Sequence, residues 1–394
     1  MNVGILSSFY PEIQGGAETS LALLLEGLRA LSLDPIILTL SKPQPNVDYR
    51  TIPIGHFADV PKRLKLLGLP GLNSILSNRL IKILSENRID ILHVNDTWSL
   101  RGASKAAEPL KIPLVLSYHN NLNIPYSSYG IPYPFSSLLD ARERGTLNVA
   151  KKSSMVLATS NYIARRLVSA GLSPASVKPI YIGGAIKDWG SLPIQAEDRP
   201  IRVLSVGVIQ YHKGIQNLLL AVRTLATDNV PLEVVIAGAG PYLHKLLDLA
   251  RDFGVANQTR FTGWVDAQEL TELYDWCDTT VVPTLTPEPF GRVAVEAMSR
   301  GRPVIGTNHG GLAEIIEDNE TGYLVPPGSP TAIADRLLLF RNHPNLLAEM
   351  GKRALARCKA VFDQRLIAKQ VLEVYDYLSS SSWKSAPRPA AENQ

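Results

Sequence analysis

The sequence predicts an α/β protein made of two Rossmann-like, doubly wound parallel-sheet domains that face a cleft. Three observations support this. The 394 residues exceed the size at which one hydrophobic core keeps growing. Short runs rich in Val, Ile and Leu alternate with helical stretches along the chain. This alternation is interrupted once, by an irregular stretch at 188–200, and then restarts.

The first half contains near-continuous apolar runs of the kind found in strands that helices cover on both faces. These runs are Val3–Ser7, Ile36–Leu40, Ile89–Val94, Leu114–Ser117, Met155–Thr159 and Val177–Ile182. Between the first two lies Glu18–Leu31, in which leucines recur at helical spacing. Repetition of strand, helix and strand implies right-handed crossovers in an open parallel sheet.

The second half repeats the pattern. Strands are expected at Arg202–Val206, Leu232–Ala237, Arg260–Thr262, Thr279–Pro283, Pro303–Thr307 and Gly322–Val325, with helices at 215–226, 242–253, 267–276, 292–300 and 330–341. The predicted division is an N-terminal domain at 1–187, a linker at 188–200, a C-terminal domain at 201–360, an amphipathic helix at 361–380 and a tail at 381–394. The tail is rich in Ser, Pro and Ala, so we expect it to be disordered.

The composition is typical of a soluble globular protein, with 45% hydrophobic and 19% charged residues. The two cysteines, Cys277 and Cys358, form neither a metal-ligand spacing nor a disulfide framework, which suits a reducing compartment. The N-terminal residues lack the features of a signal peptide. No apolar run approaches the roughly 18 residues that span a bilayer. We therefore expect a cytoplasmic protein.

Residues 60–105 are basic, and two interpretations remain open. This segment contains eight basic and three acidic residues. The basic residues are Lys62, Arg63, Lys65, Arg79, Lys82, Arg88, Arg101 and Lys105. A solvated helical face is the simpler interpretation. Because leucines interleave the first cations, weak contact with an anionic membrane is the alternative, and it would place the protein at the inner face of that membrane. Nucleic acid is not an expected partner, since no recognised binding module accompanies the modest positive charge.

Ligands of open α/β sheets bind at the carboxyl ends of the strands, and several features of the first domain lie there. Gly15 and Gly16 follow the first strand and lead into the first helix, where glycine lets backbone N–H groups approach a phosphate. An ordinary strand-to-helix turn explains them equally well. His119 ends the strand that begins at Leu114, beside two asparagines, and is a candidate functional residue.

The second domain has matching features. Gly207 follows its first strand, and Lys213 opens the next helix as a candidate partner for a diphosphate. Gly238 and Gly240 follow the second strand and supply two of the three glycines of a dinucleotide fingerprint, which alone is a weak signal.

A loop that turns into a helix follows the fourth strand of the second domain. Glu288 is expected in the loop and Glu296 about two turns into the helix, among apolar neighbours. The amides near Phe290, Gly291 and Arg292 would form a helix N-terminus that suits an anion. Two glutamates could also indicate glycoside hydrolysis or metal binding. Hydrolysis fits poorly with a glutamate inside a phosphate-binding helix, and no His or Asp-x-Asp cluster accompanies the pair.

The wider string resembles the signature of the family 4 (group 1) retaining glycosyltransferases. It comprises Glu288-Pro289-Phe290-Gly291, Glu296-Ala297-Met298-Ser299-Arg300-Gly301-Arg302-Pro303 and Thr321-Gly322-Tyr323-Leu324-Val325-Pro326. The similarity also covers Gly15-Gly16-Ala17-Glu18, Lys213-Gly214 and Phe261-Thr262-Gly263-Trp264. It implies a GT-B fold whose C-terminal helix crosses back to the N-terminal domain.

The resemblance also implies a reaction. A sugar would pass from a nucleotide-diphosphate donor to a glycan, lipid-linked or small-molecule acceptor on the N-terminal domain, with retention and without a metal or cofactor. Catalytic roles would fall on Glu288, which binds the donor sugar, on Lys213, which neutralises the leaving phosphate, and on His119, which lines the sugar or acceptor side.

Donor-binding roles follow from the same resemblance. Glu296 would hold the ribose hydroxyls, and the main chain around Gly263 and Trp264 would lie near the base. The remaining positions would surround the diphosphate: Gly15, Gly16, Gly207, Lys213, Gly238, Gly240, Phe290, Gly291 and Arg292.

The sequence departs from the family pattern at Val208, where relatives usually have an arginine. Arg292 or Arg202 could take that role. Ala239 stands where many relatives have an acidic residue, and Gly183-Gly184 stands in place of Asn-Gly. Two further hypotheses stay open, namely a nucleotide-sugar epimerase on the same scaffold and a non-catalytic relative that only binds a nucleotide.

Overall fold

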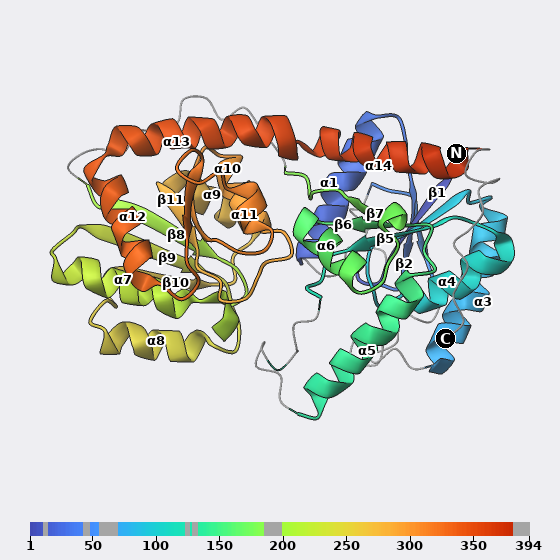
Figure 1. Ribbon diagram of the computed structural model, residues 1–394, viewed down its shortest axis with the longest axis horizontal. Helices are drawn as coiled ribbons and strands as arrows, with labels where there is room; N and C mark the ends of the chain where they lie inside the picture. The colour runs from blue at the N-terminus through green and yellow to red at the C-terminus, as the bar shows by residue number, and fades with distance from the viewer. Residues whose placement is uncertain are drawn as a thin grey trace. The chain divides into compact units, whose positions relative to one another are not determined.

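The computed structural model of the chain describes residues 1–10, 15–41, 48–54, 70–122, 127, 133–184 and 199–380 (Figure 1). The predicted tail, most of the predicted linker, and Lys62, Arg63 and Lys65 of the basic segment lie outside the described residues. The chain forms two compact units, one from residues 1–122, 138–183 and 364 onward, the other from residues 123–137 and 184–363.

Within the described residues, the first unit holds a seven-stranded parallel sheet in the order β3-β2-β1-β4-β5-β6-β7. Its strands are β1 (Val3–Ser7), β2 (Ile36–Thr39), β3 (Thr51–Pro53), β4 (Ile91–Val94), β5 (Leu114–Tyr118), β6 (Met155–Ala158) and β7 (Val177–Pro179). The helices are α1 (Gly16–Ala30), α3 (Pro70–Glu86), α4 (Leu100–Leu110), α5 (Phe135–Ala150), α6 (Asn161–Ser169) and α14 (Gln364–Ser379). The three-residue strand β3 was not predicted, because so short a run has no readable periodicity.

Two apolar layers cover this sheet, one on each face. Leu76 of α3, Ala103 of α4 and Ile163 of α6 pack on one face. Leu25 of α1 and Val371 of α14 belong to the layer on the other face. Figure 1 shows α14 beside α1, far from it in sequence. The C-terminal helix therefore packs on the sheet of the N-terminal unit, as predicted.

The second unit holds a six-stranded parallel sheet, again counted over the described part of the chain, in the order β10-β9-β8-β11-β12-β13. Its strands are β8 (Ile201–Val206), β9 (Leu232–Ala237), β10 (Thr259–Gly263), β11 (Thr279–Val282), β12 (Val304–Thr307) and β13 (Gly322–Val325). The helices are α7 (Ile215–Thr227), α8 (Leu243–Asp252), α9 (Ala267–Trp276), α10 (Arg292–Met298), α11 (Leu312–Ile315), α12 (Pro330–Asn342) and α13 (Pro344–Arg357), with a π-helical turn at Cys358–Phe362. The predicted fold class, two doubly wound parallel sheets, is confirmed.

Helix α13 was not predicted, although its sequence carries a start signal. Pro344 occupies its first position, which suits the fixed backbone angle of proline. Leu347, Met350 and Ala354 are buried at helical spacing. No helix in the described part of the chain is both long enough and apolar enough to cross a membrane.

A buried histidine fastens α14 to the first sheet. The two ring nitrogens of His93 on β4 lie 2.5 Å from the Tyr375 hydroxyl and 2.8 Å from the Ser117 hydroxyl. His93 and Tyr375 have no exposed surface. Burial lowers the pKa of His93 to about 3, with a smaller contribution from His119. The ring is therefore neutral, with one nitrogen that donates and one that accepts.

Tyr375→Phe removes one of these partners and leaves a ring nitrogen unsatisfied in the core. We expect the free energy of unfolding to fall by about 1–3 kcal/mol, the usual penalty for an unpaired buried polar group. Urea denaturation followed by circular dichroism measures it. Tyr377→Phe on the same helix is the control, since that side chain is 52% exposed. Equal losses in the two variants would contradict the role given to the His93–Tyr375 contact.

Candidate functional site

The carboxyl edge of the second sheet has a topological switch point between β8 and β11. From β8 the chain continues to β9 on one side, whereas from β11 it continues to β12 on the other. The loops that leave these two neighbouring strands therefore diverge, and a ligand site is expected between them. Gly207 and Lys213 follow β8, and Glu288 and Gly291 follow β11.

Lys213 and Glu288 meet across this switch point. The Lys213 Nζ lies 2.7 Å from Glu288 Oε1, and the side chains are 30% and 15% exposed. Lys213 ends a 3-10 turn at Tyr211–Lys213, which Gly214 separates from α7. The contact is a charge-assisted hydrogen bond between two partly buried groups. Without its partner, either group would be a poorly solvated and unpaired charge.

Backbone hydrogen bonds hold the same loops together. The Leu285 amide donates to the His212 carbonyl at 2.7 Å, and the Gly311 amide donates to the Glu288 carbonyl at 2.7 Å. His309 Nε2 lies 3.1 Å from the Thr284 carbonyl oxygen. The loops after β8, β11 and β12 thus form one connected rim.

His212 lies inside this rim beside Lys213. Burial lowers its pKa to about 4, and the Lys213 charge acts in the same direction, while Glu288 acts against them. A neutral imidazole at pH 7 avoids a second positive charge next to Lys213.

Two glycines permit the close approach of the loops. Gly214, with φ of +71°, caps α7, and a Cβ there would lie 1.9 Å from the Pro283 carbonyl oxygen. Gly238, with φ of +147°, follows β9, and a Cβ there would lie 1.9 Å from the Gly207 carbonyl oxygen. Both positions need a residue without a side chain.

Glu296 is the centre of a second polar cluster. Its Oε1 accepts from Arg292 Nη1 at 2.8 Å, and its Oε2 accepts from the Tyr274 hydroxyl at 2.9 Å. Tyr274 is 2% exposed, and burial followed by the Glu296 charge raises its pKa, so the hydroxyl stays protonated. Since α10 begins at Arg292, Glu296 lies one turn into the helix and not two as predicted. Sequence reasoning missed Tyr274, because its partner is set by the packing of α9 against α10.

The remaining predicted donor residues of the second unit divide into backbone and side-chain positions. Phe290 is 3% exposed and packs edge-on against Phe362, so only its main chain can meet a ligand. Trp264 is 63% exposed. It follows Gly263, whose carbonyl accepts from the Gly238 amide at 2.7 Å. Gly240 packs on the Ile209 carbonyl.

Val208 follows Gly207 at the same edge and is 55% exposed. Arg202, one suggested substitute for the expected arginine, is the second residue of β8 and lies 3.7 Å from Glu233. It therefore lies toward the opposite end of the strand. Arg292, already paired with Glu296, is the better placed of the two.

Gly15, Gly16 and His119 belong to the first unit. Gly15 precedes α1, and nothing lies within 4 Å of a Cβ built on Gly16, so the backbone there is open. His119 directly follows β5, and its Nε2 lies 3.2 Å from Asn95 Oδ1. Burial lowers its pKa to about 4. Its buried Nδ1 has no hydrogen-bond partner in the described part of the chain, and the ring lines a cavity of about 40 Å³.

Two family models match the chain, and together they cover most of it. The model described as Glycosyltransferase Family 4 matches residues 14–183, and the model described as Glycosyl transferases group 1 matches residues 193–357.

Relatives and solved structures agree with these models. Glycogen synthase of Mycobacterium tuberculosis is 27% identical over 77% of this chain and 72% of its own length. Phosphatidyl-myo-inositol mannosyltransferase of Mycobacterium leprae is 24% identical over 98% of this chain and 99% of its own. The structure of Anabaena HepE in complex with UDP and glucose has a TM-score of 0.76 and 21% identity, covering 95% of this chain and 99% of that one.

Gly214→Ala tests the contact between the two rim loops. Gly254 has nearly the same φ, +70° against +71°, but nothing lies within 4 Å of a Cβ there. Gly254→Ala should therefore cost only the left-handed backbone strain of about 1–2 kcal/mol. Gly214→Ala should cost more, because the Pro283 carbonyl must also move. Urea denaturation of both variants compares them, and equal losses would show that the loops do not constrain each other.

Proposed function

The chain belongs to the family 4 (group 1) glycosyltransferases, a retaining family that uses nucleotide-sugar donors, and we propose that its own donor is a UDP-sugar. The observation that carries the site assignment is the Lys213–Glu288 contact of 2.7 Å at the switch point of the second sheet. The choice of base draws on HepE, whose structure holds UDP.

In this proposal Lys213 and Glu288 act on the two sides of the bond that breaks. The ammonium group of Lys213 has three donors, so it can keep Glu288 and also hydrogen-bond the diphosphate. Glu288 has remaining acceptor sites for hydroxyls of the donor sugar. Negative charge develops on the diphosphate as it departs, and a fixed cation stabilises that charge more in the transition state than in the ground state.

The bonds exchanged are those at the anomeric carbon. The bond from C1 to the phosphate oxygen breaks, and the acceptor hydroxyl forms the new C1–O bond on the same face. Its proton passes to the departing phosphate oxygen. Main-chain amides at Gly291 and Arg292 supply further donors to the diphosphate at the start of α10.

Glu296 binds the ribose in the same proposal. Tyr274 and Arg292 fix its carboxylate from two sides, which orients the remaining lone pairs. The exposed ring of Trp264 and the main chain of Gly263 border the base. His119 lines the acceptor side of the first unit, where the neutral imidazole can accept a hydrogen bond from a hydroxyl.

One observation favours a second candidate. The side chain of Val208 cannot donate a hydrogen bond to a phosphate, which favours a protein that binds nucleotide sugars without transferring them. Such a protein would bind a UDP-sugar yet release no UDP, with or without acceptors. Cytoplasmic location and contact with anionic membranes stay predictions.

Glu296→Gln tests the donor site. Loss of the charged acceptor should raise the Kd for UDP by about 10- to 100-fold, the usual effect of removing hydrogen bonds to a charged group. Isothermal titration measures it, with Glu349→Gln as the control because that side chain is 65% exposed and lies on α13. Equal affinity of the wild-type protein for UDP, ADP and GDP would contradict the choice of base, and unchanged affinity in Glu296→Gln would contradict the ribose assignment.

A further inference from the structure

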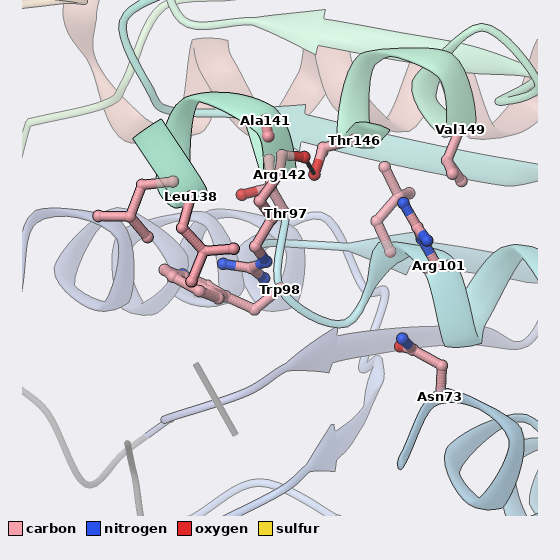
Figure 2. A pocket seen from close by; sticks show the side chains of 11 residues that line it. Asn73, Thr97, Trp98, Arg101, Leu138, Ala141, Arg142, Thr146 and Val149 are labelled. Carbon is pink, nitrogen blue, oxygen red and sulfur yellow. Dashed lines mark hydrogen bonds between the residues drawn. The ribbon is translucent and has the colours of Figure 1, made fainter. Parts of the chain in front are cut away.

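A cavity of about 280 Å³ lies within the first unit, and none of the candidate site residues discussed above lines it (Figure 2). Its walls come from α3, the loop before α4, α4 itself and α5. The volume is close to the lower end of the about 300–1,000 Å³ that is usual for small-molecule sites.

Asp96 does not line the cavity itself, but it holds the loop that forms one of its walls. Its carboxylate accepts from the Ser8 amide at 2.7 Å, the Trp98 amide at 2.8 Å and the Ser99 amide at 3.0 Å. These bonds fix the loop between β4 and α4, which presents Thr97 and Trp98 to the cavity. Asp96, through these three hydrogen bonds, therefore holds the loop that carries the Trp98 indole.

Two arginines make the cavity positive. Arg142 of α5 places its Cζ 3.3 Å from the centre of the Trp98 ring, and Arg101 comes from α4. Figure 2 shows Arg142 over Trp98 at one end of the cavity and Arg101 at the other. In the described part of the chain, the side chain of Arg101 makes no ion pair or hydrogen bond, and its Nη2 would lie 2.8 Å from a Cβ built on Gly145.

No acidic residue lines the cavity among the residues that the structure describes. The nearest carboxyl groups in sequence, Asp140 and Glu143 on α5, are not part of the lining, and Glu143 accepts from the Tyr118 hydroxyl at 3.3 Å. The described lining thus offers two guanidinium groups and no carboxylate. This lining suits a phosphate, which carries a charge of about −1.5 to −2 as a monoester and accepts paired hydrogen bonds from arginine.

The rest of the lining is apolar. Leu100, Leu138, Leu139 and Val149 face the same cavity. Leu138 is 54% exposed, and Phe135, three residues earlier on α5, is 63% exposed. An exposed apolar strip that continues from a positive cavity suits a ligand with a charged head and an apolar chain.

We propose that this cavity binds the phosphate of a lipid. Arg101 and Arg142 hold the phosphate, and the leucines of α4 and α5 cover the first carbons of the lipid chain. The inference names the acceptor class, a lipid-linked phosphate, and in that respect rests on the proposed transferase function. The binding step itself depends only on the cavity.

Isothermal titration with farnesyl phosphate, a soluble isoprenoid phosphate, tests the proposal on the full-length protein. Arg101→Gln and Arg142→Gln should each raise its Kd about tenfold or more, since each removes charged hydrogen bonds. Arg144→Gln is the matched control, because it is an exposed arginine of α5 outside the lining and should leave the Kd unchanged. Farnesol and inorganic phosphate should each bind at least tenfold more weakly than farnesyl phosphate.

Thermal denaturation confirms that each variant is folded, and UDP is titrated into the same samples. Equal Kd values in all three arginine variants would overturn the proposal. Inorganic phosphate that binds as tightly as farnesyl phosphate would also overturn it and would indicate a site for free phosphate. Farnesol that binds as tightly as farnesyl phosphate would overturn it too and would indicate an apolar pocket. A wild-type protein that binds UDP but not farnesyl phosphate contradicts the lipid site alone, whereas failure to bind UDP contradicts the proposed donor.

Discussion

The contact between Lys213 and Glu288 is the constraint on which the second unit's site depends. The two residues come from loops that leave adjacent strands in opposite directions, so nothing in the local sequence holds them together. Pairing of two partly buried charges, backbone bonds such as that from Leu285 to His212, and the close approach at Gly214 bring the loops into one rim. A polar site is thus stabilised by the same interactions that position it.

The first unit uses the same principle with different residues. His93 and Tyr375 join β4 to α14 through a buried neutral hydrogen bond, while Asp96 fixes the loop that follows β4. His93 is paired through both ring nitrogens and Asp96 through both carboxylate oxygens, as the burial of polar groups requires. His119 and the cationic cavity of Arg101 and Arg142 are the places where polar atoms face space that a ligand can fill.

The sequence predicts the two sheets and the loops at the carboxyl ends of their strands well, because apolar strand runs and loop glycines depend mainly on local conformational preferences. It singles out Lys213, Glu288 and Glu296 as candidate site residues. It does not predict that Lys213 contacts Glu288 or that Tyr274 donates to Glu296, because tertiary packing decides both contacts. Helix α13 was missed although Pro344 signals its start. The cavity around Trp98 leaves no readable pattern, because its walls join three helices that are distant in sequence.

A double-mutant cycle on Lys213 and Glu288 tests the central claim most directly. Release of UDP from a UDP-sugar is measured for the wild type, Lys213→Gln, Glu288→Gln and the double variant. If the pair acts as a unit, each single change lowers kcat/KM by about 100-fold or more, and the double variant loses little beyond either single one. Fully additive losses, or single variants with unchanged kcat/KM, would contradict the claim that this contact organises the site.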